Sequence, residues 1–68
     1  MPASMLELLT WVDARTRTYD EAIDAWGSHC PRLTTWDDAM IEGLIRRERR
    51  DGGPVVVLTP RGREMLQG

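Results

Sequence analysis

The chain contains no lysine and no phenylalanine, and only one cysteine and one histidine among its 68 residues. A single cysteine cannot form an internal disulfide framework, which favours a reducing, cytoplasmic location. Cys30 directly follows His29, but these two ligands are too few for a zinc site, and adjacent side chains rarely meet in catalytic geometry. We therefore predict that both are structural loop residues and that the protein uses no metal or other cofactor.

Patterns typical of membrane proteins and enzymes are also missing. No apolar run approaches the about 20 residues that cross a bilayer, and the N-terminus lacks the pattern of a signal peptide. Gly52-Gly53 is typical of a hairpin turn rather than of a phosphate-binding loop. Asp37 and Asp38 are adjacent on a predicted helix, where side chains diverge by about 100°, so they do not form a catalytic pair. We predict a protein that is not an enzyme and has no membrane partner.

The small size of the chain limits its core. We expect residues 1–68 to form a single domain. A chain of this length buries roughly 60% of the surface that its unfolded form exposes, so its core is marginal. Contact with a second copy or with another partner would help to stabilise it.

The net charge of -2 hides an asymmetry between the two halves of the chain. Residues 1–43 carry eight acidic side chains and three arginines, which gives -5, and residues 44–68 carry six arginines and three acids, which gives +3. An acidic balance argues against a generic nucleic-acid binder. The positive charge is concentrated in the segment 46–50, so any contact with an anionic partner is expected there.

Apolar residues at helical spacing predict two helices in the first half. Ser4 is expected to cap the first, which ends near Ala14 or Arg15. Its apolar positions are Met5, Leu8, Leu9 and Val12. The segment Thr18–Glu21 fits a capping box at the start of the second helix, and Gly27 is expected to end that helix. The apolar face of the second helix is Tyr19, Ala22, Ile23 and Trp26.

A third helix is predicted after a loop over Ser28–Leu33, in which Pro31 blocks helix continuation. Thr34 or Thr35 is expected to cap it, and Asp37 and Asp38 then lie in its first turn, where the helix dipole favours acids. Its apolar stripe is Trp36, Ala39, Met40 and Gly43. The two tryptophans of the second and third helices, at this spacing, are expected to be core residues.

A β-hairpin is predicted directly after this helix, which Gly43 ends. The first strand runs from Leu44 to about Arg50, and Asp51–Gly53 supplies the positive φ values of the turn. A two-residue loop at Asp51-Gly52 or at Gly52-Gly53 gives the same alternation of faces. The faces are Ile45, Arg47 and Arg49 with Val56 and Leu58, and Arg46 and Glu48 with Val55 and Val57.

The elements that flank the hairpin complete the pattern. Thr59 is expected to cap a last short helix with Pro60 as its first residue. The Arg15–Arg17 segment is a candidate third strand beside the hairpin. If it does not cover Val55 and Val57, and no second chain does, those two residues are exposed.

The segment Ile41–Leu66 resembles the corresponding part of MarR-like bacterial winged-helix regulators. The resemblance lies in Gly43-Leu44-Ile45, the arginine-rich run that follows, and Leu58-Thr59-Pro60-Arg61-Gly62. It implies a winged helix-turn-helix fold, mainly α with a small β-hairpin (α+β): three helices, a two-stranded wing and a short C-terminal helix. In that family the third helix enters the major groove and the wing touches phosphates or the minor groove.

The exposed face of the third helix is predicted to be acidic, and carboxylates near phosphates are repelled. We therefore expect a small DNA-binding transcriptional regulator, working as a dimer, whose wing carries the contact with double-stranded DNA. The predicted DNA-binding residues are Thr34, Thr35, Arg46, Arg47, Arg49 and Arg50. The alternative is a protein-interaction module on the same fold that does not bind DNA. Its predicted binding residues are Asp37, Asp38, Ile41, Glu42, Val55 and Val57.

Overall fold

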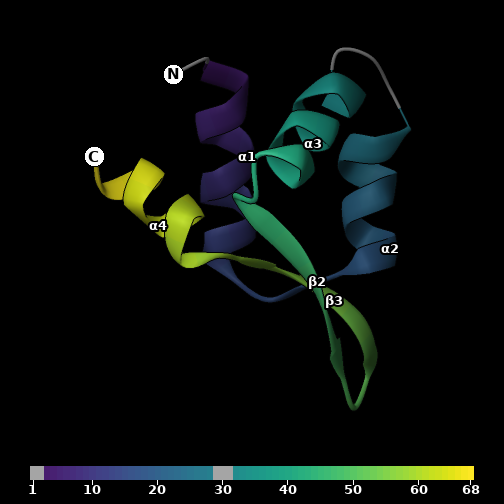
Figure 1. Ribbon diagram of the computed structural model, residues 1–68. Coiled ribbons are helices and arrows are strands. Elements are labelled where there is room, and N and C mark those ends of the chain that lie inside the picture. Colours follow the sequence, from purple (N-terminus) through teal and green to yellow (C-terminus); the bar gives the residue numbers. More distant parts are fainter. Residues whose placement is uncertain (1–2, 29–31) are drawn as a thin grey trace.

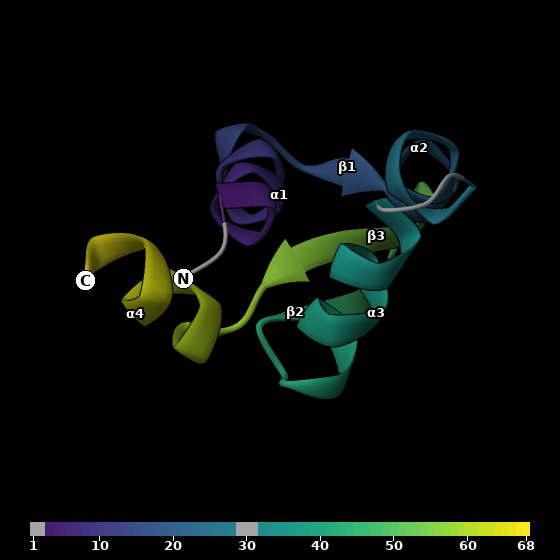
Figure 2. The ribbon, with the colours of Figure 1, turned by 90° about the horizontal axis from the view of Figure 1, so that it is seen from above.

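Helices and a small sheet alternate along the chain in the computed structural model, which describes residues 3–28 and 32–68. The elements are α1 (Ala3–Ala14), β1 (Arg17–Thr18), α2 (Tyr19–Ala22), the π-helical turn η1 (Ile23–Gly27), α3 (Arg32–Ile41), β2 (Ile45–Arg50), β3 (Gly53–Leu58) and α4 (Pro60–Gln67). Figure 1 shows the β2–β3 hairpin projecting away from the helices, and Figures 1 and 2 both place α1 between α4 and α2. This is the predicted element order, and no helix among the described residues is long and apolar enough to cross a membrane.

The sheet has the order β1-β3-β2, with β3 in the centre and both pairings antiparallel. Ile45 pairs with Leu58 and Arg47 with Val56, which confirms the predicted division of the hairpin into two faces. The predicted third strand exists, shifted toward the C-terminus, because Arg17 and Thr18 rather than Arg15 pair with β3.

The hairpin turn is made by Asp51 and Gly52, since Arg50 pairs with Gly53. Within the hairpin turn, a positive φ is found only at Gly53, with φ 108°, and not at the two loop residues. The sequence therefore predicted the turn correctly but assigned the left-handed conformation to more residues than adopt it.

The core lies between α1, α3 and one face of the sheet. Its largest fully buried side chains are Leu8, Leu9, Leu44, Ile45 and Val56. Trp26 and Trp36 are buried in the same cluster, which confirms them as core residues. Burial of side chains of this size stabilises a fold by about 1.5–3 kcal/mol each relative to full exposure.

Helix ends follow local hydrogen bonds that the sequence predicts. The Glu21 amide donates to the Thr18 hydroxyl at 3.0 Å and the Thr18 amide donates to the Glu21 carboxylate at 3.3 Å, which completes the capping box. After α3, Gly43 has φ 70°, and the amides of Gly43 and Leu44 donate back to Met40 and Ala39. These two bonds form a Schellman motif that ends the helix and turns the chain into β2.

The start of α3 differs from the prediction. The helix begins at Arg32, so neither Thr34 nor Thr35 caps it, and Asp37 and Asp38 lie beyond its first turn. The Arg32 guanidinium packs over the Trp26 ring at 4.8 Å and donates to the Ala25 carbonyl at 3.2 Å, which ties the first residue of the helix to η1.

Three further assignments are also corrected. Thr35 replaces Met40 in the buried stripe of α3, and Met40 is 37% exposed. Ser4 lies inside α1 rather than before it. Gly27 is the last helical residue of η1, with Ser28 as its C-cap, rather than the residue that follows the helix. The predicted loop residues His29 and Cys30, and the helix-blocking Pro31, lie outside the described residues.

We predict that Gly62→Ala destabilises the protein by about 1–3 kcal/mol, although alanine favours helices, because the added methyl group overpacks the site. A Cβ at Gly62 would lie 2.1 Å from the Leu44 carbonyl oxygen. Thermal unfolding would show a Tm lowered by at least about 4 °C. The matched control is Gly52→Ala, where the added Cβ has no atom within 4 Å. Equal Tm values for the two variants would contradict the close approach of Gly62 to Leu44.

Candidate nucleic-acid interface

The four predicted arginines of the wing are all exposed, but the alternation of β2 distributes them over two faces. Arg47 and Arg49 lie opposite Val56 and Pro54 on the face that continues the core side of the sheet. Arg46 and Arg50 lie on the other face together with Glu48. The two faces therefore differ in net charge, and each is described in turn.

Glu48 neutralises much of the positive charge on its own face. One carboxylate oxygen lies 3.0 Å from Nε of Arg50 and the other 3.2 Å from Nη2 of Arg46. The hydrogen bond from Arg50, together with the charges of both arginines, holds the pKa of Glu48 below its usual range. Arg46 and Arg50 are thus tied to a carboxylate that a phosphate would have to displace.

Arg47 and Arg49 form a cationic face without such a partner. Among residues 3–28 and 32–68, neither guanidinium forms an ion pair with a carboxylate. Together with Pro54 they line an open hollow of 330 Å³. We call this feature the wing hollow; its lining combines two guanidinium groups that have no ion-pair partner among the described residues with the apolar ring of Pro54.

Aromatic packing holds Arg47 in place. Its guanidinium carbon lies 4.8 Å from the centre of the Tyr19 ring, and that ring packs edge-on against Trp36 at 6.1 Å. A cation over an aromatic face is attracted by about 0.5–1 kcal/mol at an exposed site. The side chain is therefore oriented by contact with the core before any ligand arrives.

The outer face of α3 carries acids around an apolar side chain. Thr34, Asp37, Asp38 and Ile41 follow the i, i+3, i+4, i+7 spacing of one helix face, and all are exposed. Glu42, also exposed, follows in the turn after the helix. This confirms the predicted acidic character of the face, which cannot neutralise phosphates.

Two of the predicted site residues are not where the sequence placed them. Thr35 is 8% exposed and its hydroxyl donates to the Ser4 hydroxyl at 3.2 Å, so it faces α1 rather than solvent. Val55 is 7% exposed, because β3 is the central strand and Val55 lies between Thr18 of β1 and Glu48 of β2. The predicted third strand, β1, therefore lies beside Val55, which is buried. Val57 stays partly exposed.

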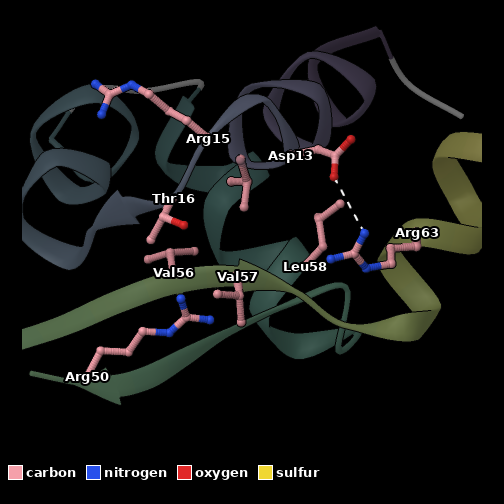
Figure 3. Close-up of a pocket in the computed structure, with 9 residues that line it drawn as sticks. Asp13, Arg15, Thr16, Arg50, Val56, Val57, Leu58 and Arg63 are labelled. Atoms are coloured by element: carbon pink, nitrogen blue, oxygen red, sulfur yellow. Dashed lines mark ion pairs between the residues drawn. The ribbon is translucent and has the colours of Figure 1, made fainter.

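Sequence reasoning missed a second pocket, of 230 Å³, between the end of α1, β3 and α4 (Figure 3). Its floor includes Val57 and Leu58, and Arg50 and Arg63 reach toward it. Arg63 lies 3.8 Å from Asp13, and Arg50 is already bound to Glu48. The charges of this pocket are therefore largely compensated, unlike those of the wing hollow. Its residues come from four separate segments, and no local sequence signal joins them.

Comparisons with known proteins agree with the fold. Neither a family model nor a curated protein sequence matches the chain. Among solved structures, the transcriptional regulator BldR from Sulfolobus solfataricus is similar, with a TM-score of 0.70 and 20% sequence identity. The match covers 98% of this chain and 51% of that one, so the chain spans about half the length of BldR. The likeness confirms the winged helix-turn-helix fold predicted from the sequence.

We predict that the pKa of Glu48 rises toward its ordinary value when Arg46 and Arg50 are both replaced by alanine, as measured by NMR titration of the side chain. In the wild type the folded-state pKa is lowered. The pairing therefore stabilises the fold above the usual glutamate range, and this contribution is lost as pH falls through the lowered pKa. The contribution is small because the groups are exposed. An unchanged Glu48 pKa in the double variant would show that the two ion pairs do not persist in solution.

Proposed function

We propose that this protein is a small DNA-binding winged-helix transcriptional regulator that contacts DNA phosphates through Arg47 and Arg49 of the wing. The observation that carries the proposal is the wing hollow, where two guanidinium groups have no carboxylate partner among the described residues. The fold is shared with BldR, which is itself a transcriptional regulator. A cytoplasmic location, one domain over residues 1–68 and the absence of catalysis complete the proposal.

The charge of α3 argues for a wing-led contact rather than deep insertion of this helix into the major groove. Asp37, Asp38 and Glu42 are exposed on its outer face. Near a duplex they would be repelled by phosphates, and the only favourable base contact for a carboxylate is the cytosine amino group. Affinity then has to come from basic residues outside α3, and half of the eight arginines there lie on the wing.

The two wing faces are expected to contribute unequally. A phosphate that approaches Arg47 and Arg49 displaces no carboxylate, whereas one that approaches Arg46 and Arg50 competes with Glu48. Arginine binds phosphate through paired hydrogen bonds as well as charge. Arg47 is also oriented in advance by Tyr19. Thr34 is exposed in the first turn of α3. We propose that its hydroxyl donates a hydrogen bond to a phosphate of the DNA backbone.

We predict that Arg47→Ala/Arg49→Ala weakens binding to mixed-sequence duplex DNA and lowers the slope of log K against log salt by about 2. Fluorescence anisotropy at several salt concentrations measures both quantities. The matched control, Arg46→Ala/Arg50→Ala, removes the same formal charge but is expected to lose clearly less affinity. Equal losses in the two variants would contradict the assignment of the contact to one face. Absence of wild-type binding at low salt would overturn the proposal.

A protein-interaction module on the same fold is the second candidate function. It is favoured by Ile41, which is 82% exposed and is surrounded by Asp37, Asp38 and Glu42. Burial of this side chain against a partner would remove apolar surface from water. A protein that binds this chain at a fixed molar ratio, together with no binding of DNA by the chain at low salt, would favour this function.

A further inference from the structure

The end of α3 presents a projecting apolar side chain that the proposed DNA contact does not use. Among residues 3–28 and 32–68, Ile41 is the most exposed large hydrophobic residue, at 82%, and Met40 beside it is 37% exposed. Asp37, Asp38 and Glu42 border Ile41, and none of them forms an ion pair with an arginine among the described residues. We call Asp37, Asp38, Ile41 and Glu42 the α3 knob.

The wing hollow carries the opposite charge to the α3 knob. It is an open hollow of 330 Å³ lined by Arg47, Arg49 and Pro54. The side chain of one isoleucine is much smaller than this volume. The knob and the hollow therefore carry opposite charges, and each includes one apolar residue, Ile41 in the knob and Pro54 in the hollow.

We propose that the α3 knob of one copy of this chain docks into the wing hollow of a second copy. Within one molecule the two features do not pair, because the acids of the knob form no ion pair with Arg47 or Arg49. The hairpin projects away from the helices, as Figure 1 shows, which leaves it accessible to another molecule. The charge asymmetry of the chain, -5 over residues 1–43 and +3 over residues 44–68, also favours contact between unlike halves.

The contact joins two different surfaces, so its symmetry is constrained. Two copies close into a pair if each knob reaches the hollow of the other, and otherwise the contact continues from molecule to molecule. In either case it occupies Arg47 and Arg49. A second copy of the chain and a DNA phosphate then compete for the same two arginines. Self-association and the proposed DNA contact therefore exclude one another.

Self-association is tested on the full chain without DNA, by sedimentation equilibrium over a range of protein concentrations. At low salt the weight-average mass is expected to rise with concentration above the 7.8 kDa of one chain. In about 1 M salt, where the Debye length is only about 3 Å, the mass is expected to return toward that of one chain. A wild-type mass that stays at one chain at low salt and at every concentration would overturn the proposal.

Two variants locate the contact. The knob variant Asp37→Asn/Asp38→Asn/Ile41→Ser and the hollow variant Arg47→Ala/Arg49→Ala are each expected to remain monomeric. All five positions are exposed, and circular dichroism checks that each variant folds. An equimolar mixture of the two is expected to regain a 1:1 complex, because each retains the surface that the other lacks. The control Arg46→Ala/Arg50→Ala should associate like the wild type.

The outcomes separate this proposal from the DNA proposal. Association that survives in both the knob and the hollow variants would place the contact elsewhere and overturn the docking. The knob variant is expected to bind DNA at least as tightly as the wild type, because it keeps Arg47 and Arg49 and loses two carboxylates. A wild type that self-associates as described but does not bind DNA would sustain the docking while removing the proposed function.

Discussion

The position of the wing depends on a short set of backbone contacts at its base. Gly43 ends α3 in a left-handed conformation, and the next carbonyl, that of Leu44, accepts a hydrogen bond from the Thr59 amide at 3.1 Å. The Thr59 hydroxyl donates to the Gly43 carbonyl and also accepts from the Gly62 amide, so one side chain joins the start of β2 to the start of α4. Because Gly62 has no side chain, α4 can lie directly against Leu44. These contacts fix where the hairpin leaves the body of the protein.

The chemistry of the wing follows from the period of a β-strand. Side chains alternate along β2, so a single acid in a run of arginines neutralises only the face on which it lies. Glu48 therefore compensates Arg46 and Arg50 and leaves Arg47 and Arg49 uncompensated. A glutamate one position earlier or later in the strand would reverse the two faces. The acidic face of α3 repels anions, so an anion is attracted mainly to the wing.

Features set by neighbours in the chain were predictable from the sequence. The Thr18–Glu21 capping box, the Gly43 helix end and the two hairpin faces each depend on residues within a few positions of one another. Features set by distant contacts were not. α3 begins at Arg32, which packs over Trp26 of η1, and Val55 is buried in the strand that pairs with β1. The division of the arginines into paired and unpaired groups needed the side-chain geometry, although the sequence already placed Glu48 on one face.

Arg47 lies over the Tyr19 ring and Tyr19 packs edge-on against Trp36, so aromatic contacts join the wing to the core. A long side chain that is free in solution loses about 0.5–1.5 kcal/mol of rotational entropy when a ligand immobilises it. In this structure the guanidinium of Arg47 already lies against the Tyr19 ring, where β2 meets the helices. Binding of an anion at Arg47 therefore costs less side-chain entropy than binding at an arginine without such a contact.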